Sequence, residues 1–265
     1  PEVTNEALLC ENITVYGPRN LRDLVEFLCG RVPLSPAERH ERREHIMSDV
    51  DYAEVQGQIM AKKAMEIAAA GAHNVLMTGP PGSGKTMLAR RITTILPPMS
   101  REEALEVTKI YSVAGLYKAD DIIRERPFRS PHHTISMAGL IGGGSIPRPG
   151  EVTLAHRGVL FLDELPEFPR NVLEVLRQPL EDREVHISRV NAAFTYPADF
   201  ILIAAMNPCP CGYLGDPERE CTCSDGEIRR YGQKISGPLL DRIDLHVSVQ
   251  RPKYSELTAT IQGEP

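Results

Sequence analysis

The stretch that most constrains this chain is the run at positions 79–86, Gly-Pro-Pro-Gly-Ser-Gly-Lys-Thr. It fits the pattern GxxxxGK(S/T), in which the backbone N–H groups of a glycine-rich loop surround phosphate oxygens. The apolar run Val75-Leu76-Met77 precedes the loop and predicts a buried strand. Apolar residues spaced for one face of a helix follow it, from Leu88 to Leu96, before Pro97-Pro98. The loop therefore stands between a strand and a helix, as this motif requires.

Each position of the loop has an expected role. The glycines allow the close backbone turn, and the N-terminus of the following helix adds partial positive charge. Lys85 is expected to reach the β- and γ-phosphates of ATP, and the hydroxyl of Thr86 is expected to bind Mg²⁺. A chance match in a loop rich in glycine and proline is the alternative, and both flanks argue against it. The predicted nucleotide-binding residues of the loop are Gly79, Pro80, Pro81, Gly82, Ser83, Gly84, Lys85, Thr86 and Met87.

The composition is that of a globular protein, with 42% hydrophobic and 25% charged residues in a chain of 265. No apolar run approaches the ~20 residues of a membrane span, and no signal peptide opens the sequence. The net charge of −6 gives no general attraction to nucleic acid, so DNA binding would use local basic clusters. Six cysteines beside a nucleotide site favour a reducing compartment, and we predict a cytoplasmic protein with no membrane partner.

Residues 1–45 are predicted to be a linker with a short helical extension. Asn20 is placed to cap a helix from Leu21 to Leu28, and Ser35 begins a capping box before a highly charged helix at 38–45. Residues 46–265 are predicted to form the nucleotide-binding core. Because the sequence starts at a proline and ends without a terminal element, we expect it to be a piece of a longer chain.

Strand patterns alternate with helix patterns throughout this core. Further strands are predicted at 158–162, 200–205 and 243–249, and helices before Gly71, after Ser100 and around 227–231. Another helix is expected where Val172, Leu176 and Leu180 recur every fourth residue. This alternation around a phosphate-binding loop predicts an α/β fold, with a parallel sheet and helices on both of its faces.

Two further segments have distinctive patterns. Residues 126–156 are dense in Gly, Pro, Arg and His, and we expect little regular structure there, which is typical of a functional segment. The adjacent His132 and His133 are expected to point to opposite sides of an extended chain and not to share a metal ion. Residues 184–198 alternate around Arg189-Val190-Asn191 and predict a β-hairpin.

Polar side chains follow two of the buried strands. Asp163 stands at the carboxyl end of its strand, where open α/β sheets bind ligands, and is expected to hold Mg²⁺. Glu164 is expected to accept a proton from the attacking water; a solvated acidic pair is the alternative. Asn207 ends the next strand, and its amide is expected to orient that water, although asparagine before proline is also a common turn residue.

Arg242 stands just before the last strand. Its guanidinium is suited to the charge that spreads over a transferring phosphoryl group, in this case on a neighbouring subunit's ATP. A structural salt bridge to Asp241 or Asp244 is the alternative.

Four of the six cysteines fall within one polar segment: Cys209, Cys211, Cys221 and Cys223. As thiolates they would bind Zn²⁺ tetrahedrally, and a polar loop gives free thiols no packing role. Inert or redox-active thiols are the alternative, because two C-x-C pairs are less diagnostic than two C-x₂-C pairs. We predict a structural zinc site.

Taken together, the motifs resemble the AAA+ ATPases and, within them, the Mg-chelatase-like branch called the YifB or competence protein ComM family. The resemblance covers about residues 50–249 and is carried by five stretches: GPPGSGKTMLA, RPFRSPHH, GGG-x₂-PRPGE-x₂-LAH-x-GVLFLDELPEF, MNPCPCG and SGPLLDRIDLH. Members of this family have an upstream Lon-protease-like domain and a downstream helical lid with a second sensor arginine, and we expect neither in this sequence.

The resemblance implies roles for particular residues. It makes 79–86 the Walker A motif, Asp163-Glu164 Walker B, Asn207 sensor 1 and Arg242 the arginine finger. It also implies that Val55 and Gly57 belong to the segment that flanks adenine. Residues 135–156 match the insert in helix 2, and 184–198 match the hairpin before sensor 1; in related ring ATPases both face the central pore. Candidate DNA contacts are therefore Arg148 and Arg189, for which simple solvation is the alternative.

Several functions are compatible with these residues. The first is a hexameric ATP-driven motor on DNA, since members of the family are implicated in branch migration during natural transformation. The second is the ATPase subunit of a magnesium-chelatase-like complex. The third is a chaperone-like remodeller of proteins.

Overall fold

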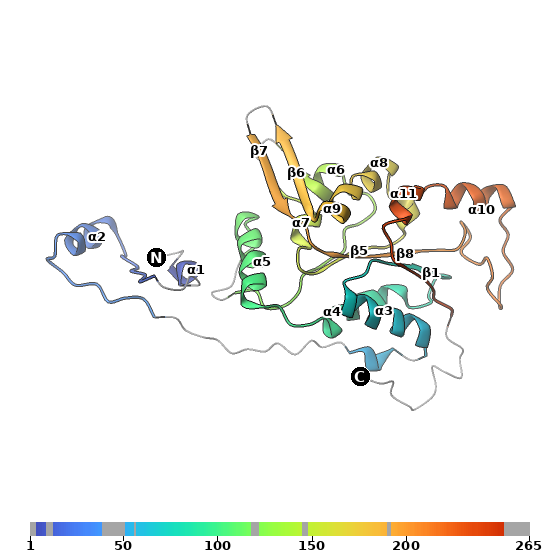
Figure 1. Cartoon of the computed structure of the whole chain (residues 1–265), viewed down its shortest axis with the longest axis horizontal. Helices are drawn as coiled ribbons and strands as arrows, with labels where there is room; N and C mark the ends of the chain where they lie inside the picture. The colour runs from blue at the N-terminus through green and yellow to red at the C-terminus, as the bar shows by residue number, and fades with distance from the viewer. Residues whose placement is uncertain are drawn as a thin grey trace.

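A five-stranded parallel sheet forms the centre of the computed structural model, which describes residues 4–8, 13–38, 51–55, 57–117, 122–144, 148–189 and 192–251. The strand order is β2-β5-β8-β1-β9, and each neighbouring pair is parallel (Figure 1). The strands are β1 (Val75–Thr78), β2 (Phe128–Arg129), β5 (Val159–Leu162), β8 (Ile201–Met206) and β9 (Leu245–Ser248). The expected α/β class and the parallel sheet are confirmed, although β9 is shorter than the pattern predicts.

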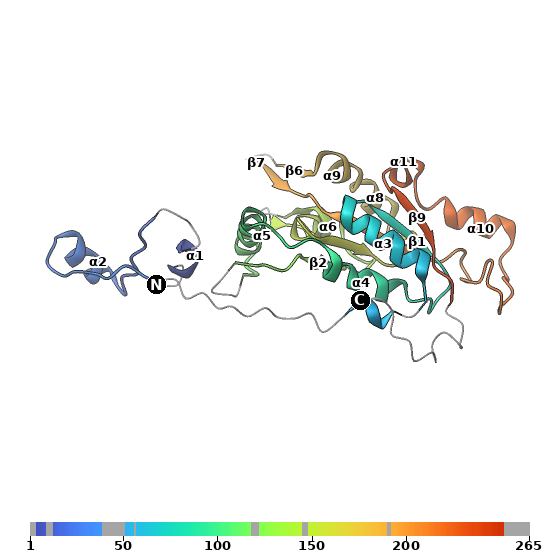
Figure 2. The same ribbon diagram turned by 60° about the horizontal axis from the view of Figure 1, so that its bottom comes forward.

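Successive side chains of each strand point to opposite faces of the sheet, so the apolar residues of the strands contribute to two separate cores. On β1, Val75 and Met77 face one core while Leu76 faces the other. The first core is covered by α3 (Ile59–Gly71) and α4 (Lys85–Ile95). The second is covered by α6 (Met137–Ile141), α7 (Glu151–Leu154), α8 (Arg170–Glu174) and α11 (Gly237–Leu240). Figure 2 shows the two groups of helices on opposite sides of the sheet, as expected for a doubly covered parallel sheet.

The helix expected around Val172, Leu176 and Leu180 is divided in two, so the prediction of one continuous helix was wrong. The chain forms α8 (Arg170–Glu174) and then α9 (Arg177–Asp182). Pro179 has no N–H to donate to the backbone of the preceding turn, and Leu176 bonds instead to the carbonyl of Leu173 at 3.1 Å. The apolar spacing was nevertheless right, because Val172 and Leu176 are both buried.

The segment 126–156, for which we expected little regular structure, contains several short elements. Besides β2, α6 and α7 it forms a small antiparallel pair, β3 (Gly142–Gly143) and β4 (Arg148–Pro149). This insert between α6 and α7 packs against the expected hairpin of β6 (Glu184–Arg189) and β7 (Ala192–Pro197). A Cβ at Gly142 would lie 3.1 Å from the Cδ1 of Ile187, so the insert and the hairpin are in contact. The hairpin tip, Val190 and Asn191, lies outside the described residues.

The remaining elements lie around this core. The helix α1 (Thr4–Ala7) precedes α2 (Leu21–Leu28), which has the expected Asn20 cap and no buried residue. The expected charged helix at 38–45 lies almost wholly outside the described residues. Ser100 forms the predicted capping box of α5 (Arg101–Val113). Short 3₁₀ turns, η1 (Tyr52–Glu54) and η2 (Leu165–Glu167), and α10 (Asp225–Gly232) complete the set. Among the described residues, no helix has the length and apolar character to cross a membrane.

Asn74 holds three segments together at the start of β1. Its Oδ1 accepts the N–H of Leu202 at 2.8 Å, and its Nδ2 donates to the carbonyl of Arg242 at 2.9 Å. Its own N–H donates to Asp244 Oδ2 at 2.9 Å. One side chain thus connects the starts of β1 and β8 to the segment that carries Arg242.

We expect Asn74→Ala to lower the free energy of unfolding by about 1–3 kcal/mol, because it leaves the N–H of Leu202 and the carbonyl of Arg242 without a partner. Chemical denaturation of the variant and the parent measures this difference. Asn171→Ala, at an exposed position of α8, is the control and should change stability by less than about 0.5 kcal/mol. Equal effects from both substitutions would contradict a connecting role for Asn74.

Candidate nucleotide-binding site

The loop between β1 and α4 has the shape of a phosphate cradle. Gly82 and Gly84 adopt φ of 76° and 91°, the left-handed region that glycine occupies without strain. A Cβ at Gly79 would lie 2.0 Å from the carbonyl oxygen of Val249, so only glycine fits there. No heavy atom of the described chain lies within 4 Å of a Cβ placed at Gly82, which leaves the inside of the loop open.

Lys85, the first residue of α4, is held across this loop. Its Nζ donates to the carbonyls of Gly79 at 2.7 Å and Pro80 at 3.0 Å, and lies 3.4 Å from Asn207 Oδ1. Burial lowers the pKa of the ammonium, while Asp163 and Glu164 oppose that shift. The ammonium is therefore preorganised beside Asn207, at the start of α4 where a lysine of this motif reaches phosphate.

Thr86 and Asp163 meet at the mouth of the loop, as the sequence predicts. The Thr86 hydroxyl donates to Asp163 Oδ2 at 2.8 Å, and Asp163 Oδ1 accepts the N–H of Glu164 at 3.0 Å. A hydroxyl and a carboxylate side by side are ligands that Mg²⁺ prefers. Thr86 stands in the first turn of α4 and Asp163 directly follows β5, so the site joins a helix start to a strand end.

Glu164 is held in a strained backbone conformation with its carboxylate outward. Its φ of 52° and ψ of 47° are left-handed, at a cost of roughly 1–2 kcal/mol for a residue other than glycine. Its side chain is 57% exposed, and Oε2 lies 3.4 Å from Nδ1 of His133. Backbone strain of this kind clusters at functional sites. The conformation supports the expected role of Glu164 beside the phosphates.

His133 is a site residue that the sequence analysis did not identify. We expected His132 and His133 on opposite sides of an extended chain, but that was wrong: the chain turns here, and the ring centroids lie 4.0 Å apart. The turn directs His133 toward Glu164, and no metal-binding group among the described residues includes either histidine. The available signal was the RPFRSPHH stretch itself, in which the two histidines closely follow the residues that form the edge strand β2 (Phe128–Arg129).

The segment before α3 contacts the phosphate loop from the other side. Val55 is fully buried and Gly57 has a φ of 64°, while Gln56 between them lies outside the described residues. Gln58 Nε2 donates to the carbonyl of Ser83 at 3.2 Å, which ties this segment to the loop. Met87 on α4 is 37% exposed. The placement of adenine against these residues stays a prediction.

The cradle fits a nucleoside triphosphate with Mg²⁺. Ser83 Oγ is buried and has no hydrogen-bond partner among the described residues, which is costly unless a ligand supplies one. The unpaired Ser83 hydroxyl, the left-handed glycines, the Lys85 ammonium and the Thr86–Asp163 pair together indicate a phosphate-binding site.

Arg242 is directed away from this cradle within the single chain. Its guanidinium bonds to the carboxylate of Glu181 on α9 and to the carbonyl of Pro238. The salt bridge that the sequence left open therefore exists, but with Glu181 rather than Asp241 or Asp244. Asp244 instead accepts the N–H of Asn74. Among the described contacts, none places Arg242 on the phosphate loop of its own chain.

Comparison with known proteins identifies the family. Residues 51–257 match the family model for magnesium chelatase, subunit ChlI. The chain belongs to this family. It is 50% identical over 212 residues to YifB of Escherichia coli and 48% identical over 250 residues to competence protein ComM of Haemophilus influenzae. These matches cover 80% and 92% of this chain but 41% and 48% of the relatives, so the chain spans less than half of their length.

A solved structure of NtrX from Brucella abortus in complex with ADP matches with a TM-score of 0.47 at 20% identity, over 74% of this chain and 37% of that one. The expected resemblance to the Mg-chelatase-like AAA+ ATPases, with YifB and ComM among the relatives, is confirmed. The helix-2 insert and the hairpin before sensor 1 are both present.

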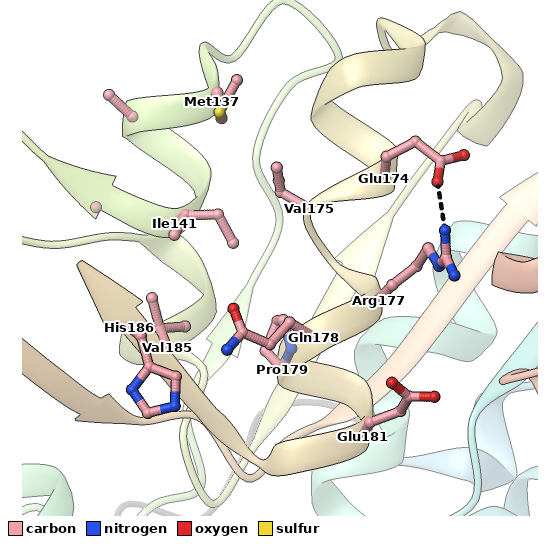
Figure 3. A pocket seen from close by; sticks show the side chains of 12 residues that line it. Met137, Ile141, Glu174, Val175, Arg177, Gln178, Pro179, Glu181, Val185 and His186 are labelled. Carbon is pink, nitrogen blue, oxygen red and sulfur yellow. Dashed lines mark hydrogen bonds and ion pairs between the residues drawn. The ribbon is translucent and has the colours of Figure 1, made fainter. Parts of the chain in front are cut away.

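A pocket of about 540 Å³ lies away from the cradle of this ChlI-family core, between α6, α8–α9 and strand β6 (Figure 3). Met137 and Ile141 line one side, and an ion pair between Arg177 and Glu174 at 3.2 Å lines another. Glu181, the partner of Arg242, is on its rim. The pocket therefore joins the insert, the hairpin and the Arg242 contact on one part of the surface.

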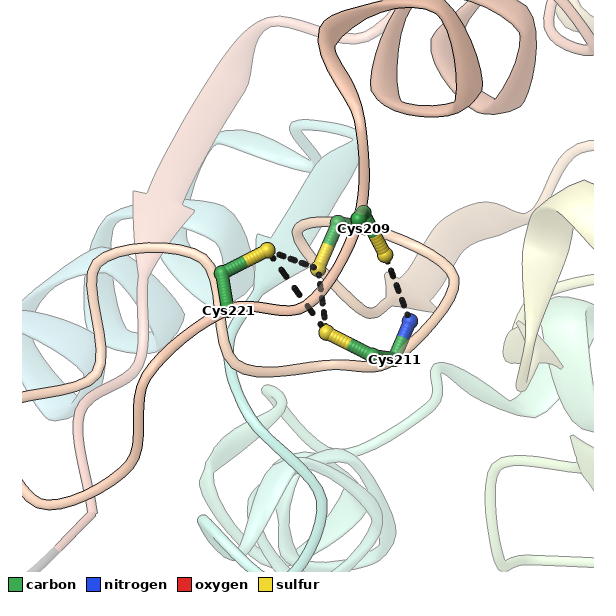
Figure 4. A group of neighbouring side chains, drawn as sticks. Cys209, Cys211 and Cys221 are labelled. Carbon is green, nitrogen blue, oxygen red and sulfur yellow. Dashed lines mark hydrogen bonds between the residues drawn. The ribbon is translucent and has the colours of Figure 1, made fainter.

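The four cysteines gather after Asn207, in a segment that we call the cysteine loop, residues 208–223. Cys209 Sγ lies 3.4 Å from that of Cys211 and 3.6 Å from that of Cys221 (Figure 4). With Cys223, all four sulfur atoms lie within 4.8 Å of one another, and none forms a disulfide. Backbone N–H groups of the cysteine loop lower the pKa of Cys211 to about 5. The arrangement suits a four-coordinate metal ion, whose ligands would be thiolates.

We expect Lys85→Ala to abolish nucleotide binding, because it removes the ammonium that bonds to the loop carbonyls of Gly79 and Pro80. Glu164→Gln should bind ATP and Mg²⁺ as the parent does and fail to hydrolyse it, because the amide accepts no proton from water. Equilibrium binding and phosphate release of the full-length protein separate the two effects. Turnover by Glu164→Gln at the parent's rate would contradict the general-base role.

Proposed function

We propose that this chain is the ATP-hydrolysing core of a DNA-acting motor of the ComM type, which works in branch migration during natural transformation or recombination. The observation that carries the proposal is the pairing of a complete nucleotide site with an insert and a hairpin that pack on each other. The similarity to competence protein ComM over 92% of the chain supports the choice within the family.

The hydrolysis roles follow from the contacts around the cradle. Bound Mg²⁺ would neutralise charge on the phosphates. Lys85 stabilises phosphate charge from the inside of the loop, and Asn207 stands 3.4 Å from its Nζ, where the amide orients water. Glu164 receives the proton of that water, and its exposed, outward carboxylate is reachable from the solvent side.

The DNA-contacting surface is proposed to be the hairpin and the adjacent insert. Phe194 on β7 is 39% exposed and stacks on Tyr196, with the ring planes 11° apart. Arg189 ends β6, and Arg148 is exposed on β4. Exposed aromatic rings together with arginines are the combination with which proteins bind single-stranded nucleic acid. A local surface of this kind is compatible with the chain's net charge of −6.

The proposed assembly is a homo-oligomeric ring, hexameric in the full-length protein. In it, Arg242 would act on the ATP of the neighbouring subunit. This is supported by the direction of the guanidinium, which lies toward α9 and not toward its own cradle. The carboxylate of Glu181 would be exchanged for phosphate oxygens when subunits meet.

We also propose that the cysteine loop holds Zn²⁺ as a structural ion. In a tetrahedral site with Zn–S bonds of about 2.3 Å, sulfur atoms lie about 3.8 Å apart. The three measured separations of 3.4, 3.6 and 3.6 Å are close to that value. Free thiols in a cytoplasmic protein have no other reason to converge this closely.

The ATPase subunit of a magnesium-chelatase-like complex is the second candidate, supported by the description of the matching family. The cysteine loop and the RPFRSPHH stretch resemble the ComM branch instead. A protein-remodelling role is the third candidate, and no described residue favours it over DNA.

We expect the ATPase activity of the full-length protein to be stimulated by single-stranded or branched DNA. Arg189→Ala and Phe194→Ala should weaken that stimulation about tenfold, since each base stacked on an aromatic ring contributes about 1–3 kcal/mol, and leave basal hydrolysis unchanged. Arg22→Ala, an exposed arginine on α2, is the control. Stimulation by a porphyrin-binding partner and not by DNA would favour the chelatase function.

Arg242→Ala should bind ATP normally and hydrolyse it slower by about 10³–10⁵, the contribution of such an arginine in other phosphoryl-transfer systems. Mixing it with Lys85→Ala subunits should restore part of the activity, because each supplies what the other lacks. Glu181→Ala, which removes the partner of Arg242 in the single chain, should retain hydrolysis. Loss of activity in Glu181→Ala with no recovery on mixing would show that the ion pair is only structural.

A further inference from the structure

The cysteine loop lies directly on the phosphate loop. Gly212, beside Cys211, approaches Pro81 so closely that a Cβ there would lie 2.7 Å from Pro81 Cδ and 2.9 Å from Cγ. Arg251 makes a second bridge, with one amino group 3.3 Å from Glu218 of the cysteine loop and the other 3.5 Å from the carbonyl of Pro81. The two loops are therefore in contact at the residue that precedes the left-handed Gly82.

The cysteine loop also begins at the sensor asparagine. Asn207 is followed by Pro208 and then by Cys209, which is fully buried. The N–H of Gly212 donates to the carbonyl of Cys209 at 3.0 Å, so the turn that brings Gly212 to Pro81 starts at a cysteine of the cluster. The hydroxyl of Tyr231 on α10 interacts with the backbone of Asn207 from the other side. The position of Asn207, and with it the Lys85 contact, depends on how this turn is held.

We propose that a thiophilic divalent cation in the cysteine loop positions the phosphate loop, through Gly212 on Pro81 and through Asn207, so that metal and nucleotide strengthen each other's binding. The proposal rests on the metal site proposed above and on no DNA-related function. A cross-link among four side chains removes freedom from a loop with no sheet pairing of its own, and that loop packs on Pro81 of the phosphate loop through Gly212. Gly212 and Asn207 act here as positioning residues.

Two glycines of the same loop provide a matched pair of variants. Gly212 and Gly215 both have left-handed φ, 87° and 76°. A Cβ at Gly212 meets Pro81, whereas no described heavy atom lies within 4 Å of a Cβ at Gly215. Gly212→Ala and Gly215→Ala therefore carry similar backbone strain, and they differ in the contact with the phosphate loop.

The test uses the full-length protein purified with zinc in the medium and measures zinc content and ADP affinity without DNA. We expect about one equivalent of zinc in the parent and in both glycine variants. ADP should bind about fivefold or more weakly to Gly212→Ala, the lower range of coupling between sites, and with parental affinity to Gly215→Ala. Cys221→Ser should contain less zinc and also bind ADP more weakly.

Thermodynamic linkage between the metal and ADP provides a second test, which uses the parent protein alone. If the metal tightens ADP binding by some factor, ADP must tighten metal binding by the same factor. Competition with a chelator should therefore show a higher zinc affinity in the presence of ADP. The proposal is overturned if the parent binds no zinc, if zinc removal leaves ADP affinity unchanged in folded protein, or if the two glycine variants bind ADP equally. None of these outcomes depends on whether DNA stimulates hydrolysis, so failure of the motor function would be seen separately.

Discussion

The parallel register between β1, β8 and β5 is the constraint on which the nucleotide site depends. Thr78 is paired with Met206, and Leu162 with Ala204, so the carboxyl ends of the three strands lie at one edge. The N–H of Gly79 donates to the carbonyl of Met206 at 3.2 Å, which fixes the start of the phosphate loop beside the end of β8. A slip of one residue would turn Lys85, Asp163 and Asn207 away from one another and exchange the two cores.

Much of this arrangement could be predicted because it is local. The loop motif, the buried strands and the caps at Asn20 and Ser100 depend on residues close together in the sequence. Asp163 and Asn207 were predictable for a different reason: strands of a parallel sheet end at one edge, so residues after them must converge. The division of α8 from α9 was also local, and the missing N–H of Pro179 was the overlooked signal.

The remaining features depend on contacts that no local pattern encodes. His133 reaches Glu164 only because the chain turns after β2, and Glu181 reaches Arg242 because α9 ends beside α11. The contact of Gly212 with Pro81 requires the cysteine loop to fold back over the cradle. The glycine alone suggests a turn, and its closeness to the phosphate loop becomes apparent only from the tertiary structure.

The backbone of Arg242 is held by Asn74, whereas its guanidinium is paired with the exposed carboxylate of Glu181. Asn74 Nδ2 donates to the Arg242 carbonyl at 2.9 Å, which attaches this position to the start of β1. Its guanidinium is paired with Glu181, whose side chain is 56% exposed, and an ion pair of this kind contributes at most about 1 kcal/mol. A bidentate contact with phosphate in a dry interface is much stronger. The proposed exchange of Glu181 for a neighbour's phosphate would therefore cost little, because the backbone of Arg242 is already attached to the sheet through Asn74.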